Sequence, residues 1–327
     1  MTRLGFAGDV MLGRLIDERQ RERSVSGIWG NMEDTLRELD GFFINLECCL
    51  SARGTPWTDT YRPFHFRADP DWAVPALESV GVDWVNLANN HILDYGPDAL
   101  ADTIGYLDDA GIAHSGAGET LEAACAPAFA TVDGLDIAFV SFTDNTSEFA
   151  AGPDEPGTAY VDFDVTHPQA VRLVGNSLGR ARDADPDLLV VSLHWGPNMR
   201  TEPTVEFREF ARWLAEEGVD VVHGHSAHVF QGVEVVDETL VCYDTGDFVD
   251  DYATDSEQHN DRSFLFEVGV ADSELSDLRL RPTEIYDLAV HEAEHYAGTW
   301  SVQQMDALSS AFGTEFQRED DDLLLPL

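Results

Sequence analysis

The chain has 327 residues, enough for one large α/β domain or two small domains with a sizeable buried core. Its 62 acidic residues outnumber 19 basic residues, all of them arginine, and the net charge is −43. Such self-repulsion is tolerated where molar salt screens charges within about 3 Å, so the composition is typical of a halophilic protein. The same negative surface repels polyphosphate backbones, and we expect no nucleic-acid partner.

Two further features concern location and redox state. No run of about 18 apolar residues occurs, and the opening MTRLGFAGDVM lacks the basic and apolar parts of a secretory signal. We therefore expect a cytoplasmic protein without a membrane anchor. The four cysteines form neither a Cys-x-x-Cys pair nor a disulfide framework, so we expect buried free thiols at Cys48, Cys49, Cys125 and Cys242.

The predicted elements of roughly the first 250 residues alternate short apolar strands with amphipathic helices, which is typical of βαβ units. In chain order, the predicted strands are Leu4–Val10, Phe42–Leu46, Trp84–Ala88, Ile112–His114, Ile137–Phe142, Leu188–Leu193, Val219–Val222 and Leu240–Tyr243. The predicted helices are Met32–Leu39, Asp71–Val80, Asp98–Ala110, His167–Arg182 and Thr204–Glu217.

The rest of the chain departs from this alternation. Hairpins are predicted around Asp133-Gly134 and Asp237-Glu238. From about Ser263 the pattern is strand-like, and it ends in a helix near Val302–Phe312. Because no repeat or long linker occurs, we expect one α/β domain over residues 1–327, with its sheets covered by helices and with 271–327 as a C-terminal strand and helix extension.

Polar side chains follow six of the predicted strands. They are Asp9, the pair Asn45 and Glu47, the run Asn89-Asn90-His91, then His194, the pair His225 and His228, and Asp247. The carboxyl ends of strands in an open α/β sheet converge on one crevice. Any one of these residues could be a turn former or a satisfied structural residue, but six at one edge favour a functional site.

The residue types at these strand ends suit a divalent cation. Imidazole nitrogen combined with carboxylate and amide oxygen favours Mn, Fe or Zn without any thiolate. A carboxylate shared by two ions about 3.5–4 Å apart would activate water and stabilise attack at phosphorus. The sequence therefore predicts a site for one or two divalent metal ions.

The motifs also resemble those of a known family. In order, they read AGDVMLGR, NLECCLS, NLANNHILDYG, LHWG, VVHGHSAHVFQGVEV and YDTGDFVDDY, all within residues 3–270. This pattern resembles the capsule-synthesis CapA family, also called the poly-γ-glutamate biosynthesis family, of the calcineurin-like metallophosphoesterase superfamily. The resemblance implies a four-layer αββα sandwich.

The resemblance also implies roles for the strand-end residues. Asp9 and His228 would serve the first metal, Glu47 would stand where the superfamily has a bridging aspartate, and His91 would protonate the leaving oxygen. The implied ligands of the second metal are Asn90, His194 and His225. Asn89 and Asp94 are expected to brace the turn that carries them.

Substrate contacts are predicted around the same strand ends. Arginines near the motifs could hold an anionic substrate, because a guanidinium group matches carboxylate and phosphate forks. The predicted substrate-binding residues are Arg14, Asn45, Arg67 and Asp247, with Arg62 and Arg200 as further arginines nearby. Each arginine could instead pair with one of the many surface carboxylates.

Two departures from the superfamily pattern leave the metal count open. The first motif carries Met11 where an Asp-x-His would place a histidine, which removes one nitrogen ligand. The final Gly-His-x-His is stretched to Gly-His-Ser-Ala-His at 224–228. The sequence therefore leaves open whether one metal ion binds or two.

Three functions compete. The favoured one is a metal-dependent hydrolase, acting on a phosphoester in a small molecule or anionic polymer, in capsule, poly-γ-glutamate or cell-surface polymer metabolism. The alternative is a non-catalytic accessory or polymer-binding protein of the same process. The least favoured is a zinc protease, because HEAEH at 291–295 matches His-Glu-x-x-His, with Glu315 as a third ligand, but its flanks leave room for only a short helix.

Overall fold

A computed structural model describes residues 1–327 and contains two large β-sheets. The first has the order β19-β20-β17-β16-β1-β2-β5-β6, with β15 paired to β1 and β18 paired to β17. Its strands are β1 (Thr2–Val10), β2 (Gly41–Leu46), β5 (Val82–Asn86), β6 (Ala113–Ser115), β15 (Asp247–Val249), β16 (Arg262–Ala271), β17 (Glu274–Tyr286), β18 (Ala289–Glu292), β19 (Gln317–Glu319) and β20 (Asp322–Pro326).

The second sheet has the order β13-β14-β12-β11-β9-β8. Its strands are β8 (Ala128–Val132), β9 (Leu135–Thr143), β11 (Leu188–His194), β12 (Val221–His225), β13 (Val233–Val236) and β14 (Thr239–Cys242). Two short pairs complete the strands: β3 (Cys49–Leu50) with β4 (Arg67–Ala68), and β7 (Ala117–Gly118) with β10 (Gly157–Thr158). In the first sheet β1, β2, β5 and β6 are parallel and the strands from β16 to β19 are antiparallel, whereas the second sheet has parallel central strands and an antiparallel strand at each edge.

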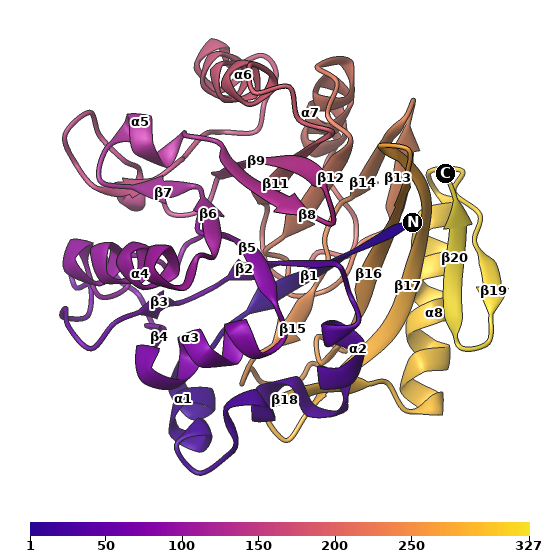
Figure 1. The fold of residues 1–327 in the computed structure, drawn as a ribbon, viewed down its shortest axis with the longest axis horizontal. Coiled ribbons are helices and arrows are strands. Elements are labelled where there is room, and N and C mark those ends of the chain that lie inside the picture. Colours follow the sequence, from indigo (N-terminus) through magenta and orange to yellow (C-terminus); the bar gives the residue numbers. More distant parts are fainter.

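Helices cover the outer faces of both sheets (Figure 1). These helices are α1 (Arg14–Gln20), α2 (Glu33–Arg37), α3 (Pro70–Ser79), α4 (Pro97–Ala110), α5 (Leu121–Ala124), α6 (Pro168–Arg182) and α7 (Val205–Glu216). The remaining helix is α8 (His295–Ser310), and 3₁₀ turns lie at Val25–Met32 and Ser147–Phe149. Helices α1 to α4 bury residues against the first sheet, and α5 to α7 against the second. The predicted four-layer αββα sandwich is therefore confirmed.

Side-chain alternation along the central strands creates three hydrophobic cores. On β2, Phe42 and Ile44 face the first helical layer, whereas Phe43 points between the sheets. Phe43 meets Phe139 of β9 there with ring centroids 4.8 Å apart. On β9 the next residue, Val140, faces the second helical layer. Strands buried on both faces explain the nearly continuous apolar runs of the sequence.

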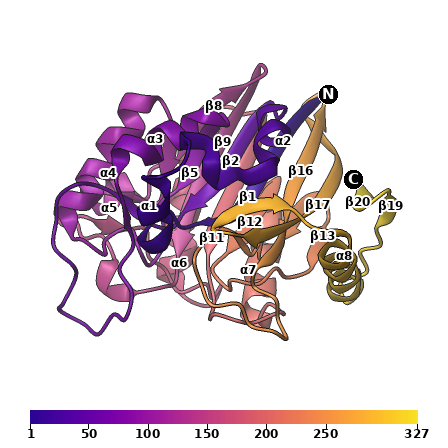
Figure 2. The same cartoon turned by 90° about the horizontal axis from the view of Figure 1, so that it is seen from below.

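Residues 271–327 continue the first sheet and add α8. Val302 and Met305 of α8 enter the core between the sheets, and the helix packs against β17 and β13. In both ribbon views α8 and α4 lie at opposite ends of the molecule (Figures 1 and 2). The predicted C-terminal helix is present, although it begins at His295 rather than near Val302.

The structure contradicts the prediction of a zinc protease from the motif HEAEH. His291 and Glu292 belong to strand β18, and α8 begins only at His295. A zincin needs both histidines on one turn of a helix, so His291 and His295 cannot form that motif. The Nδ1 atom of His291 instead lies 3.4 Å from the backbone nitrogen of Asn31.

Most predicted elements are present within a few residues of their expected ends. The strand predicted at Trp84–Ala88 ends at Asn86, because the Asn86 side chain hydrogen-bonds both the nitrogen and the carbonyl oxygen of Ala88. Helix α1 and strands β18 to β20 were not predicted. Both hairpins are confirmed, and all four cysteines are buried and free.

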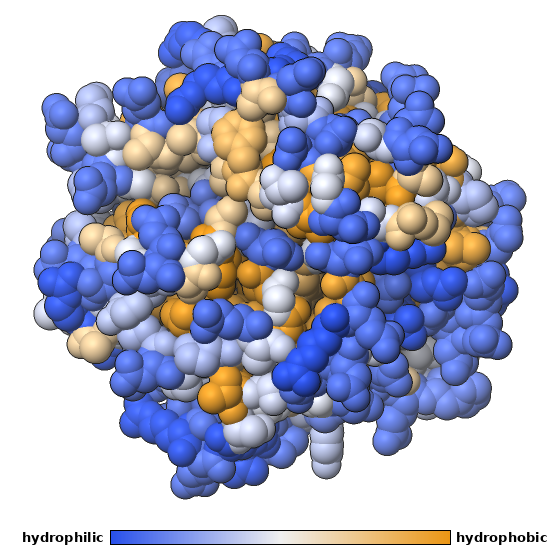
Figure 3. Space-filling model, in the orientation of Figure 1, coloured by the Kyte–Doolittle hydropathy of each residue, from blue (hydrophilic) through white to orange (hydrophobic).

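The molecular surface agrees with the charge of the chain. Hydrophilic residues cover most of the face shown in Figure 3, and hydrophobic residues gather near its middle. No helix has the length and apolar character needed to cross a membrane. A halophilic origin and a cytoplasmic location stay predictions.

Candidate metal centre

Strand register brings the predicted site residues into two facing rows. In the first sheet, Asp9 of β1 pairs with Asp247 of β15 on one side and with Asn45 of β2 on the other. In the second sheet, His194 of β11 pairs with His225 of β12. Both rows lie at the carboxyl ends of parallel strands, where α/β folds place their sites.

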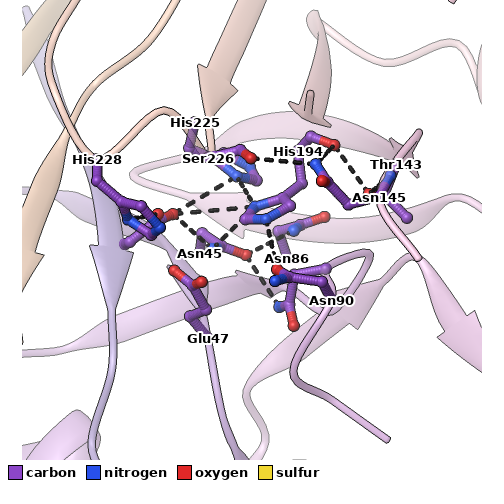
Figure 4. A network of polar contacts seen from close by, with 12 residues as sticks. Asn45, Glu47, Asn86, Asn90, Thr143, Asn145, His194, His225, Ser226 and His228 are labelled. Atoms are coloured by element: carbon purple, nitrogen blue, oxygen red, sulfur yellow. Dashed lines mark hydrogen bonds and ion pairs between the residues drawn. The ribbon is translucent and has the colours of Figure 1, made fainter. Parts of the chain in front are cut away.

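Asp9 is the centre of this arrangement. The three histidines around it, His194, His225 and His228, are labelled in Figure 4. Asn45 Nδ2 donates a hydrogen bond of 2.7 Å to Asp9 Oδ1, which fixes the carboxylate. Asp9 Oδ1 lies 3.7 Å from His225 Nδ1 and 4.0 Å from His194 Nδ1. Its other oxygen, Oδ2, lies 3.3 Å from His228 Nδ1. Three imidazoles therefore surround one buried carboxylate.

Two groups of potential ligand atoms can be drawn around Asp9, each with all its atoms within 4.8 Å of one another. One consists of Asp9, His194 and His225, and the other of Asp9, Glu47 and His228. Asp9 is common to both groups, whereas Glu47 belongs to only one. The bridging role expected of Glu47 stays a prediction.

The donor set fits divalent cations. Among the carboxylates Asp9, Glu47 and Asp247, four buried oxygens have no hydrogen-bond partner: Asp9 Oδ2, both oxygens of Glu47, and Asp247 Oδ2. A buried carboxylate without a partner is costly, and a bound cation removes that cost. Burial and the neighbouring Asp9 raise the pKa of Glu47 well above its usual range. A divalent ion would favour the ionised form instead.

The two histidines of the second sheet are in the state that metal ligation needs. Burial lowers the pKa of His194 to about 3 and that of His225 well below its usual value, so both imidazoles are neutral at neutral pH. The Ser192 hydroxyl lies 2.9 Å from His225 Nε2 and leaves Nδ1 facing Asp9. Neutral, oriented imidazoles are the usual nitrogen ligands of transition metals.

His228 differs from them because it faces carboxylates. Its Nδ1 atom lies 2.8 Å from Asp247 Oδ1. Burial alone would lower the pKa of His228, but Asp247, Asp9 and Glu47 hold it well above its usual value. In the absence of a cation, this imidazole carries the charge that compensates the carboxylates.

His91 is held at the edge of the carboxylate cluster. Its Nδ1 atom lies 2.6 Å from Asp94 Oδ2, and its Nε2 atom lies 3.8 Å from Glu47 Oε1. Arg62 Nε and the backbone nitrogen of Phe66 both donate to Asp94, at 3.1 and 2.8 Å. Burial lowers the pKa of His91, and Asp94 acts in the opposite direction. The imidazole thus presents Nε2 to the site.

The turn that follows β5 is braced as predicted. Asn89 Oδ1 accepts from the backbone nitrogen of His91, and Asn89 Nδ2 donates to the carbonyl oxygen of Leu46. Arg62 also donates to the carbonyl oxygen of Asn90. These bonds, with those of Asp94, hold His91 in place.

Asn90 lies outside both ligand groups. Its Oδ1 atom is 2.8 Å from His194 Nε2, the ring nitrogen opposite the one that faces Asp9. Its expected role as a metal ligand stays a prediction.

The predicted substrate-binding residues separate into two groups. Asn45 and Asp247 are fully buried, and their hydrogen bonds orient Asp9 and His228. Arg14 lines a cavity next to His91. Arg67 lies in a neighbouring hollow, where its guanidinium group stacks 4.1 Å from the centre of the Tyr95 ring. Their roles in substrate binding stay predictions.

Sequence reasoning missed three residues of the site. Asp250 is buried beside Asp247, and Tyr252 lies with its ring centre 5.0 Å from that of His228. Both belong to the motif YDTGDFVDDY, so the motif itself was the available signal. Phe66, which stacks on His91 at 3.9 Å, gave no such signal. Met11 points into the first core, and its sulfur accepts from the backbone nitrogen of Gly13.

The fold and the site define an αββα protein of the metallophosphoesterase type. The chain is similar to the crystal structure of a hypothetical protein from Thermus thermophilus, with a TM-score of 0.52 and 17% identity over 87% of this chain and all of that one. It is also similar to a Staphylococcus aureus protein assigned as a 5′-nucleotidase, with a TM-score of 0.51 and 13% identity over 93% of this chain and 58% of that one. At these identities the likeness concerns the fold.

Sequence comparison gives the family. Residues 3–252 match the model of the bacterial capsule synthesis protein PGA_cap, and the chain belongs to this family. It is 31% identical to the probable polyglutamine synthesis accessory protein Rv0574c of Mycobacterium tuberculosis, over 98% of this chain and 94% of that protein. It is 28% identical to the PGA biosynthesis protein CapA of Bacillus subtilis, over 75% of this chain and 62% of that protein. The CapA resemblance is thereby confirmed.

Proposed function

We propose that this protein is a metal-dependent hydrolase that cleaves a phosphoester. The observation that carries the proposal is the buried Asp9 carboxylate, shared by two groups of potential ligands and bordered by carboxylate oxygens without partners. His91 stands beside this cluster with one ring nitrogen fixed by Asp94. A ligand cluster next to a positioned proton donor is the arrangement that metal-assisted hydrolysis needs.

Each side chain has a defined task in this proposal. Asp9, His194 and His225 would hold one divalent ion, and Asp9, Glu47 and His228 would hold the other. Bound divalent ions supply a Lewis acid for the phosphoryl oxygens and lower the pKa of water. Asn45 keeps the shared carboxylate in one orientation through its 2.7 Å hydrogen bond.

His91 acts on the leaving group. Its Nδ1 atom is engaged with Asp94, so the doubly protonated imidazolium form gives the proton of Nε2 to the leaving oxygen and becomes the neutral imidazole. Water adds to phosphorus, the bond from phosphorus to the leaving oxygen breaks, and the products are an alcohol and a phosphate. A positioned general acid of this kind contributes about 10²- to 10⁴-fold to the rate.

The biological role follows from the relatives. Proteins named for capsule, PGA and polyglutamine synthesis are similar to this chain. We place the hydrolase in capsule, poly-γ-glutamate or cell-surface polymer metabolism, with a small molecule or an anionic polymer as its substrate.

The test combines metal analysis with turnover in high salt. We expect purified protein supplied with Mn²⁺ to retain one or two ions per chain and to hydrolyse phosphomonoesters or phosphodiesters. Asp9→Asn should lose the metal, whereas His91→Ala should keep it and lose turnover. His167→Ala, which changes a half-exposed histidine on another part of the molecule, serves as the control. Turnover that persists in His91→Ala contradicts the proposed role of His91.

The second candidate function is a non-catalytic accessory protein of polymer synthesis. Two observations favour it: Met11 turns into the hydrophobic core instead of the site, and the Mycobacterium tuberculosis relative is named an accessory protein. Metal retained without hydrolysis of any phosphoester would support this function over the hydrolase.

A further inference from the structure

A cavity of about 470 Å³ opens directly beside the candidate metal centre. His91 and His228 form the side of the cavity that faces the metal ligands. Phe66 and Tyr252, which pack against these two histidines, also line the cavity, together with Phe64 and Arg14. Such a volume holds a small molecule or the end of a larger one.

The charge of this cavity differs from that of the rest of the chain. Eleven residues line it, and none is aspartate or glutamate. At the overall frequency of 62 acidic residues in 327, about two of the eleven would be acidic. The cavity instead contains Arg14 and three asparagines. Arg14 pairs with Asp251 at 3.3 Å, so the lining is close to neutral and repels an anionic ester less than the surrounding surface does.

Aromatic rings cover the wall next to His91. The Phe66 ring stacks on the imidazole with centroids 3.9 Å apart, and the Phe64 ring continues the stack at 6.4 Å and an interplanar angle of 21°. The Arg14 guanidinium group lies 5.0 Å from the centre of the Phe64 ring. Although it is apolar, Phe64 is 53% exposed. One face of this stack is thus available to a further flat group.

The backbone around the cavity is held in an unusual conformation. Arg14, Met199 and His228 all have positive φ, at 55°, 60° and 60°. Residues other than glycine adopt this region rarely, and such strain persists where packing fixes it, often at functional sites. The walls of the cavity are therefore preorganised.

We propose that this cavity binds the aromatic ring of the leaving group, so that the substrates are aryl or heteroaryl esters of phosphate. This inference rests on the proposed function, because the proton of His91 goes to the leaving oxygen and the leaving group must then lie next to His91. The ring packs against the exposed Phe64, which Phe66 supports from the side of His91. Hydrolysis adds water to phosphorus, breaks the bond to the aryl oxygen, and releases a phenol and inorganic phosphate.

Phe64→Ala is the discriminating variant, since Phe64 is half-exposed and its loss leaves the buried core intact. Phe129→Ala is the matched control, because Phe129 is 49% exposed on β8, away from the cavity. We would compare phenyl phosphate with methyl phosphate by kcat/KM in Mn²⁺ and high salt. In parallel, calorimetry would compare the Kd of phenylphosphonate with that of methylphosphonate, which requires no turnover.

The expected result is a preference for the phenyl compound in both assays that falls by about three- to tenfold in Phe64→Ala and is unchanged in Phe129→Ala. Turnover without a phenyl preference, or a preference that Phe64→Ala leaves intact, overturns the inference while the hydrolase stands. If binding favours phenylphosphonate through Phe64 but neither phosphate ester is hydrolysed, the result supports binding of an aromatic ring in the cavity and contradicts the hydrolase. Binding of neither phosphonate also overturns the inference.

Discussion

The Nδ1 atom of His228 lies 2.8 Å from Oδ1 of Asp247, closer than it lies to Asp9. Asp247 and Asp9 therefore approach the same ring nitrogen, and the shorter contact with Asp247 orients the imidazole. We predict that Asp247→Asn weakens the binding of one cation by about tenfold, since groups that orient metal-ligating histidines affect affinity by 10- to 100-fold. The second ion, at Asp9, His194 and His225, should be retained.

Metal titration with Mn²⁺ measures this effect, and Asp287→Asn, an exposed surface carboxylate, is the control. Equal loss of both ions would show that Asp247 supports the whole fold of the site. Unchanged affinity would show that Asp247 does not orient His228 in solution.

Removing the metal should lower the stability of the protein. Without a cation, Asp9 Oδ2 and both carboxylate oxygens of Glu47 stay buried without a hydrogen-bond partner. A ligand that binds only the folded state adds about 2.7 kcal/mol when its concentration is 100 times its Kd. We therefore predict that a chelator lowers the midpoint of thermal unfolding measured in high salt.

The Asp9→Asn variant provides the control for this prediction. It removes the charge common to both ligand groups, so its unfolding midpoint should respond little to the chelator. A chelator effect of the same size in Asp9→Asn would place the responsible metal elsewhere in the molecule.

Much of the fold and the ligand set could be predicted because both depend on local patterns. Apolar runs defined the central strands, and strand ends must meet at one edge, which brought Asp9, Asn45 and His225 together. The sharing of a carboxylate could not be predicted, because register alone does not fix how far a side chain reaches. Asp9 belongs to both ligand groups and Glu47 to one, and the bridging role expected of Glu47 stays a prediction.

The packing of Phe66 on His91 could not be predicted from the sequence either. Phe66 lies far along the chain from His91, and the two meet only through the loop that joins β3 to β4 and the turn held by Asp94. A lone aromatic residue in a loop has no periodicity to interpret. The zinc-protease prediction from HEAEH was wrong for a different reason. The local motif does not reveal that His291 belongs to strand β18, which pairs with β17.

Tyr252 should contribute to the reaction through its hydroxyl group. This oxygen is buried and has no hydrogen-bond partner, while the ring packs against His228. We predict that Tyr252→Phe lowers kcat by about tenfold, because one lost hydrogen bond to the transition state is worth roughly 1.4 kcal/mol. KM and metal content should stay the same.

Steady-state kinetics and thermal unfolding of the same variant distinguish a hydroxyl that takes part in the reaction from one that is only buried. If Tyr252→Phe retains the full kcat and becomes more stable by about 1 kcal/mol, the hydroxyl is only an unsatisfied buried group.

Asp144 gives the protein a pH-dependent stability outside the ligand set. Burial raises the pKa of Asp144 to about 6, although the backbone nitrogen of Gly196 donates to its Oδ1. The folded state therefore holds the proton more tightly than the unfolded state, whose pKa is near 3.8. The stability from this group is complete below about pH 4 and is lost as the pH rises through about 6. Because the side chain is partly exposed, we expect about 2 kcal/mol rather than the full value of the shift.

The test is Asp144→Asn, whose amide oxygen can still accept from Gly196. Its free energy of unfolding should match that of the wild type near pH 4 and exceed it by about 2 kcal/mol near pH 7. Denaturant unfolding at constant high salt measures the difference in unfolding free energy between the variant and the wild type. The titration of the other carboxylates cancels in this difference because both proteins contain them. An equal difference at both pH values would mean that the substitution acts through packing and that Asp144 does not titrate in this range.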